Sequence, residues 1–184
     1  MENKIRKYPL FSVCGLNCGL CPRYYTAGLS RCPGCAGEGF SNVHPPCGIL
    51  SCCRRKDYEY CFECGEFPCG KYDEADTKDS FITHINQFTD MEKAKNAGMA
   101  AYEKELNEKV KILGYILKSF DDGRHKSFYC LAVNLLELKD IKATMGRMEN
   151  EIPPDSTQKE KAKACAGFFK EIAEKRNITL KLRK

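Results

Sequence analysis

The second part of the chain has a helical pattern of apolar and polar positions. From residue 82 onward, apolar side chains recur at steps of three and four residues, which places them on one face of a helix. The pattern predicts helices over residues 82–97, 99–119, 125–149 and 157–176. Amphipathic helices of these lengths pack as a small bundle around their apolar faces.

Local signals mark where these helices begin and end. Gly98 separates the first two, and a turn at residues 121–123 follows the second. Pro153-Pro154 ends the third helix, because proline cannot continue the backbone hydrogen-bond pattern. Thr157 and Glu160 have the spacing of a capping box, which predicts the start of the fourth helix.

The first 75 residues lack this periodicity and are organised by cysteine. Eleven of the 13 cysteines lie in one short stretch, in which apolar residues are few. They follow the pattern Cys14-x3-Cys18-x2-Cys21, Cys32-x2-Cys35, Cys47-x4-Cys52-Cys53 and Cys61-x2-Cys64-x4-Cys69. A segment with so small an apolar core needs another source of stability. A charged run at residues 73–79 predicts a linker after it.

The three Cys-x2-Cys pairs indicate metal binding. This spacing lets two thiolates of one tight turn reach the same ion. We expect zinc, held by four sulfurs or by three sulfurs and an imidazole, in about two to three sites. An iron–sulfur cluster uses the same ligands and stays open as an alternative. A disulfide framework is disfavoured, because it needs an oxidising compartment and the chain has an odd number of cysteines, 13.

One iron–sulfur variant has a recognisable spacing. Cys14-x3-Cys18-x2-Cys21 is also the arrangement of radical S-adenosylmethionine enzymes, in which three thiolates hold the cluster. Those enzymes build the site on an α/β barrel. The residues after Cys21 are too few for such a barrel and have no alternating strand and helix pattern, so we do not expect this enzyme class.

The candidate metal ligands are ten cysteines in this stretch: Cys14, Cys18, Cys21, Cys32, Cys35, Cys47, Cys52, Cys61, Cys64 and Cys69. Cys52 and Cys53 are neighbours, of which only one is expected to face a given metal, and we expect Cys52. His44, in a loop with two prolines, is a weaker candidate. Which cysteines share an ion is not fixed by spacing.

These residues also carry a family resemblance. The run from Cys14 to Pro22, with the later cysteine pairs and the segment Glu59–Cys69, resembles a bacterial and archaeal family catalogued as domain of unknown function 3795. The resemblance covers about residues 10–75. It implies a cysteine-rich, metal-binding domain of unknown activity, with the same ten cysteines as the matching positions and Cys53 outside the pattern.

Other chemistry-bearing residues have simpler interpretations. Cys130 and Cys165 lie among apolar residues of predicted helices and are interpreted as small core residues. Residues 121–130 combine acids, bases, an imidazole and hydroxyls, which favours turn and cap chemistry by Asp122 or Ser127 over ligand contact. No nucleophile elbow or phosphate loop is visible, and the question of an enzyme stays open.

Charge argues against nucleic acid as a partner. The whole chain has 30 Lys and Arg and 25 Asp and Glu. Residues 1–75 contain nine Lys and Arg and eight Asp and Glu, so this segment is nearly neutral. A zinc ion with four thiolates carries a net charge of about −2, which makes this segment more acidic. The small basic cluster at residues 54–56 is surrounded by acidic side chains, whereas a phosphate-binding surface needs clustered positive charge.

The lengths of the apolar runs indicate where in the cell the protein is located. No apolar run approaches the roughly 20 residues that a membrane helix needs. The charged start is followed by no apolar segment of a secretion signal. We therefore expect no membrane partner and a cytoplasmic protein, in which thiols stay reduced and bind metal.

The sequence thus predicts a small α+β protein. Residues 1–75 form a cysteine-rich zinc module of loops, turns and short strands, and residues 76–184 form a bundle-like helical domain, with a possible terminal strand at 178–182. The function we favour is a structural zinc protein that interacts with another protein or a small ligand. The alternatives are an iron–sulfur or open-site zinc enzyme or redox protein, and a nucleic-acid-binding zinc protein.

Overall fold

The computed structural model describes residues 5–73 and 77–184 and divides into two compact units. The first unit is Met1–Leu106 together with Leu182–Lys184, and the second is Asn107–Lys181. The regular structure of the described residues is helical throughout, without a strand. The predicted α+β class with short strands is therefore wrong. Residues 74–76 of the predicted linker lie outside the described part.

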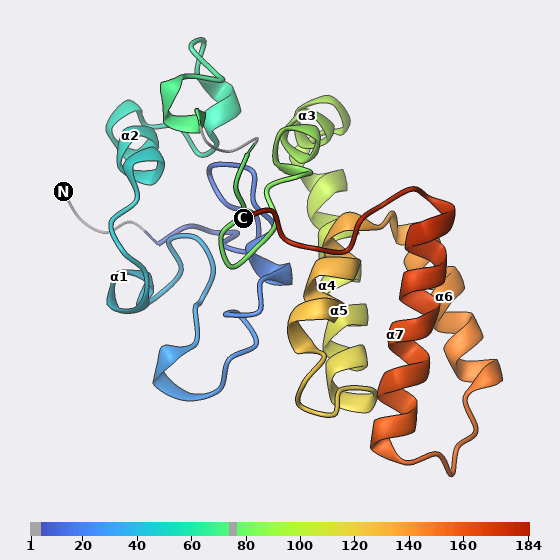
Figure 1. The fold of residues 1–184 in the computed structure, drawn as a ribbon. Coiled ribbons are helices and arrows are strands. Elements are labelled where there is room, and N and C mark those ends of the chain that lie inside the picture. The colour runs from blue at the N-terminus through green and yellow to red at the C-terminus, as the bar shows by residue number, and fades with distance from the viewer. Residues whose placement is uncertain (1–4, 74–76) are drawn as a thin grey trace. The chain divides into compact units, whose positions relative to one another are not determined.

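The first unit consists of loops and short helices (Figure 1). Its α-helices are α1 (Phe40–Val43), α2 (Gly48–Lys56), α3 (Gln87–Ala97) and the first turns of α4 (Met99–Ser119). Four 3₁₀ turns lie between them: η1 (Cys18–Leu20), η2 (Gly28–Ser30), η3 (Cys61–Glu63) and η4 (Gly70–Tyr72). Turn hydrogen bonds satisfy the backbone here, such as Cys21 N to Cys18 O at 3.2 Å and Cys64 N to Cys61 O at 3.1 Å. These local bonds replace the strand pairing that we expected.

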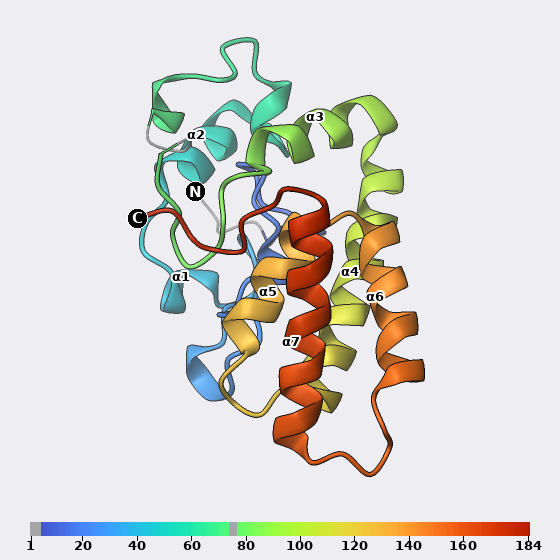
Figure 2. The same cartoon turned by 45° about the vertical axis from the view of Figure 1, so that its right-hand side comes forward.

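The second unit contains the rest of α4 and three further helices: α5 (Lys126–Leu135), α6 (Leu138–Glu151) and α7 (Gln158–Lys175). Helix α7 packs against both α5 and α6 (Figures 1 and 2). The core is formed by large side chains from all four helices, among them Leu113, Ile116, Tyr129, Ile141 and Phe169. None of the helices in the described residues has the length and apolarity to cross a bilayer.

Two of the predicted helices are confirmed closely. Helix α4 has the predicted bounds of 99 and 119. Helix α7 starts directly after Thr157, whose hydroxyl accepts a hydrogen bond from Glu160 N while the Glu160 carboxylate accepts one from Thr157 N at 2.8 Å. The reciprocal bonds are those of the predicted capping box.

Helix α3 starts later than predicted, at Gln87 rather than residue 82. The preceding residues form a turn held by side chains. The Asp79 carboxylate accepts a hydrogen bond from His84 N at 2.7 Å, and the Thr83 hydroxyl accepts one from Ile85 N at 3.2 Å. Such side-chain acceptors compete with the helical hydrogen bonds.

The predicted helix over 125–149 is two helices. Leu136 and Glu137 have extended backbone angles and separate α5 from α6. The buried amine of Lys109, on α4, donates a hydrogen bond of 2.8 Å to Leu136 O. This carbonyl stands at the end of α5 and is satisfied by a side chain from another helix, so the break needs no proline or glycine.

The predicted terminal strand is absent. Asn177 has a positive φ of 54° just after α7, and residues 178–182 follow as loop. Within the first unit, Arg183 N donates to the Asp79 carboxylate at 2.7 Å, and the Arg183 guanidinium forms an ion pair with it at 2.9 Å. The chain end is thus held by a buried carboxylate instead of a neighbouring strand.

Candidate metal centre

The predicted Cys-x2-Cys pairs lie in tight turns. Cys18 begins η1 and Cys21 directly follows it, and Cys61 begins η3 and Cys64 directly follows it. The third pair includes Gly34, whose φ is 91° and whose missing side chain lets Pro9 O approach. A Cβ at Gly34 would lie 2.5 Å from that oxygen, so the turn needs glycine.

The loop around Cys14 is held by helix α3. Gly15 has a φ of 89°, and a Cβ there would lie 2.4 Å from the Met91 side chain. The Gln87 amide donates a hydrogen bond of 2.7 Å to Cys14 O, and the Asn17 amide donates one of 2.8 Å to the Asp90 carboxylate. Helix α3 lies outside the predicted module of residues 1–75, yet it fixes the first cysteine loop.

Six of the candidate ligands form one group around Cys18. Its thiol pKa is raised well above the ordinary value, first by burial and then by Cys35, Cys14, Cys21 and Cys32. Burial also raises the pKa of Cys14 to about 12, and Cys35 and Cys47 add to this effect. Thiols that influence each other's pKa lie in one region of the structure, although no three of the described cysteine sulfurs lie within 4.8 Å of each other. We call these six cysteines the first sulfur group: Cys14, Cys18, Cys21, Cys32, Cys35 and Cys47.

A second sulfur group consists of Cys52, Cys53 and Cys61. Burial raises the pKa of Cys53 to about 12, and Cys61 and Cys52 raise it further. On helix α2, Cys53 is 3% exposed and Cys52 is half-buried. The expectation that Cys52 rather than Cys53 faces a metal stays a prediction, although the more buried Cys53 lies toward Cys61.

Cys64 follows Cys61 at the end of η3, and Cys69 lies five residues further along the chain. The Lys56 amine donates a hydrogen bond of 3.5 Å to the Cys64 sulfur and forms an ion pair of 3.0 Å with Glu66. Cys69 is half-buried at the start of η4. His44 is exposed, stacks on Phe40 with ring centroids 4.4 Å apart, and has its Nδ1 2.7 Å from Pro45 O.

The cysteine sulfurs of the described residues do not have the tetrahedral arrangement of a zinc site. Four sulfurs about 2.3 Å from one zinc ion lie about 3.8 Å from each other. In residues 5–73 and 77–184, the one set of three potential ligand atoms within 4.8 Å of each other contains no cysteine. All 13 cysteines are free thiols in the structure. Metal binding at either sulfur group therefore requires the side chains to move closer together.

Hydrogen-bond donors surround the sulfurs. The Ser12 hydroxyl lies 3.0 Å from the Cys14 sulfur and already accepts a hydrogen bond from Leu16 N. Two further donors at the sulfur groups, Arg6 Nη2 and the Tyr72 hydroxyl, are buried without a hydrogen-bond partner. A buried donor without an acceptor is costly, so these atoms fit a site whose sulfurs become thiolates.

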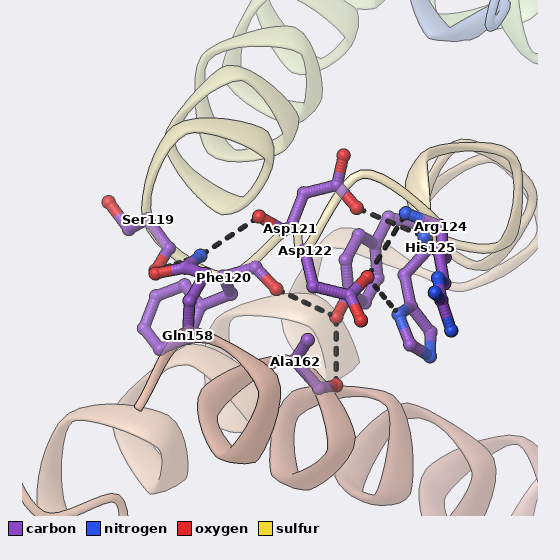
Figure 3. A network of polar contacts seen from close by, with 9 residues as sticks. Ser119, Phe120, Asp121, Asp122, Arg124, His125, Gln158 and Ala162 are labelled. Atoms are coloured by element: carbon purple, nitrogen blue, oxygen red, sulfur yellow. Dashed lines mark hydrogen bonds and ion pairs between the residues drawn. The ribbon is translucent and has the colours of Figure 1, made fainter. Parts of the chain in front are cut away.

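One set of potential ligands without cysteine is Asp121, Asp122 and His125 (Figure 3). The Asp122 carboxylate lies 2.8 Å from His125 Nδ1, and the Asp121 carboxylate accepts a hydrogen bond from His125 N at 3.0 Å. Asp122 also accepts one from Arg124 N, and its pKa is lowered mainly by the hydrogen bond with His125. These contacts close the turn before α5, as the predicted turn chemistry requires. The predicted cap by Asp122 or Ser127 is not formed, because the N-cap residue of α5 is His125, without a side-chain cap hydrogen bond.

The core interpretation of the two remaining cysteines is confirmed, because Cys130 and Cys165 are both buried. Cys165 lies next to the Tyr129 hydroxyl. The single hydrogen of this hydroxyl is shared between two carbonyl oxygens, Phe120 O at 3.1 Å and Ala162 O at 2.9 Å. Burial raises the pKa of Cys165 to about 12. A thiol of this kind is unreactive.

The first unit also has an open cavity of about 920 Å³. Its wall includes three tyrosines and three basic side chains: Tyr8, Tyr58, Tyr60, Arg6, Lys7 and Arg54. Asp57, Glu59 and Glu103 balance this charge, and Cys53 lies at the same wall. The volume is within the range of pockets that bind small molecules, about 300–1,000 Å³.

Several residues of the site carried no sequence signal. The fold alone brings Arg6 near Cys35, Tyr72 near Cys61 and the Gln87 amide to the backbone oxygen of Cys14. None of the three residues belongs to a repeated spacing. Gly15 and Gly34 are the exception, because each stands next to a candidate cysteine in the sequence and has a positive φ in the structure.

The first unit is rich in cysteine, and its Cys-x2-Cys pairs lie in tight turns. Residues 10–74 match the family described as Protein of unknown function (DUF3795), which confirms the predicted resemblance. No curated protein and no solved structure matches the chain. The description of the family names no activity, so the function has to be argued from the site.

Proposed function

We propose that the first unit binds metal through its cysteines and that the metal is structural zinc. The observation that carries this proposal is that four candidate ligands each have a polar donor beside the sulfur: Ser12 at Cys14, Arg6 at Cys35, Tyr72 at Cys61 and Lys56 at Cys64. A neutral thiol is a weak acceptor, whereas a thiolate accepts strong, charge-assisted hydrogen bonds.

Burial supports a metal rather than free thiolates. The thiols of Cys14, Cys18 and Cys35 all have raised pKa values, and burial is the first cause in each. A buried thiol stays protonated in the absence of a cation, whereas a bound metal ion deprotonates it outright. Proton release on metal binding would therefore accompany occupancy.

Stability supports a structural role. The first unit consists mainly of loops and 3₁₀ turns, and its longer helices, α3 and the start of α4, lie at its C-terminal end. Residues 1–75 therefore depend on loops and short helices for their packing. A structural zinc site supplies about 10–16 kcal/mol in small modules, more than the whole stability of many domains. The proposed ligands are the ten predicted cysteines, with the first sulfur group providing one or more sites.

Zinc is preferred over an iron–sulfur cluster because paired Cys-x2-Cys turns with four sulfurs are the usual zinc arrangement. An iron–sulfur protein or an open-site zinc enzyme remains the alternative, since the same thiolates serve both. A compartment in which thiols stay reduced, such as the cytoplasm, suits either metal.

The role we propose beyond metal binding is recognition of a small ligand or another protein. The cavity of about 920 Å³ supports the small ligand, because it combines aromatic rings with side chains of both charges. In this proposal the metal keeps the unit folded, and the cavity provides the binding surface.

Metal analysis of protein purified without oxygen tests the proposal. We expect about two to three zinc ions per chain and a colourless solution. Cys18→Ser should lower the zinc content and unfold the first unit, whereas the matched control Cys165→Ser, in the second unit, should keep the zinc. Iron with acid-labile sulfide and a brown colour would overturn zinc in favour of a cluster, and the absence of any metal would overturn the proposal.

A further inference from the structure

Arg6 lies against one of the candidate ligands. Its side chain is 5% exposed, and its Nε donates to the Glu59 carboxylate at 2.9 Å while its Nη1 donates to Phe11 O at 2.7 Å. The guanidinium carbon stands 4.9 Å from the centre of the Tyr60 ring. Three contacts thus fix the group, and its Nη2 is the atom left buried without a partner.

The sulfur beside this guanidinium is that of Cys35. Arg6 N donates a backbone hydrogen bond of 3.1 Å to Ala36 O, which holds the two segments together. Burial raises the pKa of Cys35, while the nearby positive charge of Arg6 acts in the opposite direction. A guanidinium nitrogen can only donate, so in a hydrogen bond between the two residues Cys35 would be the acceptor.

Tyr72 repeats this arrangement at the second sulfur group. Tyr72 is 6% exposed, and its ring packs against Phe67 and Phe88 with centroids 5.4 and 5.3 Å away. Its hydroxyl is buried without a partner that meets hydrogen-bond geometry. The pKa of Tyr72 is raised by burial and then by Cys61, with Cys14 and Cys53 adding to it.

Burial of the Arg6 guanidinium and the Tyr72 hydroxyl costs free energy unless each group has a strong hydrogen-bond acceptor. A buried donor without a partner costs about 1–3 kcal/mol, and more when it is charged. The neighbouring acceptors are sulfurs, which become strong acceptors only as thiolates. A metal ion held by four thiolates has a net charge of about −2, and a nearby cation offsets part of it.

We propose that Arg6 and Tyr72 donate hydrogen bonds to the metal-bound thiolates of Cys35 and Cys61. This inference rests on the proposed function. The two side chains are positioning residues and not ligands: Arg6 orients Cys35 and compensates its charge, and Tyr72 orients Cys61. Such outer partners of metal ligands alter metal affinity by about 10- to 100-fold when removed.

The experiment compares Arg6→Gln, Arg6→Lys and Tyr72→Phe with the full-length wild-type protein. Zinc content is measured first, then zinc affinity by competition with a chelator. Cobalt(II) then replaces zinc, and the energy of the sulfur-to-cobalt charge-transfer band is recorded. We expect full zinc content, about 10- to 100-fold weaker affinity for Arg6→Gln and Tyr72→Phe, and a shifted band in both. Arg6→Lys, which keeps the charge, should recover part of the loss.

Matched controls separate hydrogen bonding from packing. Glu59→Gln removes the carboxylate partner of Arg6 but leaves the guanidinium beside Cys35, so the cobalt band should not move. Tyr115→Phe removes a hydroxyl from a half-exposed ring of the second unit and should be neutral.

The outcomes are distinct for the two proposals. A wild-type protein that binds neither metal overturns the proposed function and this inference with it. A wild-type protein that binds zinc, with variants of unchanged affinity and unchanged cobalt band, overturns only the inference. Should Arg6→Gln fail to fold, Tyr72→Phe decides, since it removes a single oxygen and keeps the ring.

Discussion

The Tyr102 hydroxyl donates a hydrogen bond of 2.8 Å to the side-chain oxygen of Asn17, 85 positions earlier in the chain. Both residues are buried, and Asn17 lies between Cys14 and Cys18 in the first cysteine loop. The same amide group donates to Asp90 on α3. One asparagine therefore joins this loop to both α3 and the start of α4.

The first prediction concerns this contact. Tyr102→Phe should lower the free energy of unfolding of the zinc-loaded protein by about 1–3 kcal/mol, because it removes a buried hydrogen bond. Urea titration followed by circular dichroism measures the change. Tyr115→Phe is the control, for which we expect a change within about 0.5 kcal/mol. Equal stability of Tyr102→Phe and wild type would show that the contact is not important for the loop.

A second prediction concerns the extent of the metal-binding unit. A fragment of residues 1–75 lacks Gln87, Asp90 and Tyr102, which hold the first cysteine loop. We expect this fragment to bind zinc more weakly and to resist proteolysis less well than a fragment of residues 1–106. Chelator competition and limited proteolysis of both fragments measure this difference. If both fragments bind zinc with the same affinity, α3 and α4 are dispensable.

The third prediction separates the neighbours Cys52 and Cys53. The sequence favours Cys52 as a ligand, whereas in the structure Cys53 is the more buried and lies against Cys61. Because Cys52 is one of the ten proposed ligands, Cys52→Ser should lower the zinc content and Cys53→Ser should not. Elemental analysis of the two variants, prepared side by side, measures the difference. The opposite result would make Cys53 the ligand in place of Cys52.

Local chemistry explains which parts of the fold could be predicted. The bounds of α4 follow from an apolar face of regular period, and the start of α7 follows from Thr157 and Glu160, which lie within one turn. The break between α5 and α6 could not be predicted, because the apolar period continues through it. The Leu136 carbonyl is satisfied by Lys109, 27 positions away, and no local pattern indicates such a contact.

The candidate site also contains residues that could be predicted from the sequence and residues that could not. Cysteine spacing identifies the candidate ligands, since both members of a Cys-x2-Cys pair lie in one turn. Arg6 and Tyr72 are single residues without a repeated spacing, and they meet the sulfurs only after the chain folds. The expectation of strands failed for a related reason: turn bonds of the Cys18–Cys21 kind satisfy the backbone locally, so no ladder forms.

The fourth prediction concerns the pH dependence of the second unit. The Arg176 guanidinium forms two hydrogen bonds with the Asp140 carboxylate, at 2.9 and 2.6 Å. These bonds hold the pKa of Asp140 below its ordinary value of 3.8. Since the folded state has the lower pKa, this contribution to stability is complete above pH 3.8 and is lost as the pH falls through the folded-state value.

Carbon NMR of the Asp140 carboxyl group should therefore record a titration midpoint below 3.8. Asp140→Asn should speed amide exchange in α6 and α7 at neutral pH, and the difference from wild type should shrink in acid. Exposed Asp155 provides the control, because Asp155→Asn should leave exchange unchanged at both pH values. A midpoint at or above 3.8, or a difference that does not depend on pH, would mean that the ion pair contributes nothing to the stability of this unit.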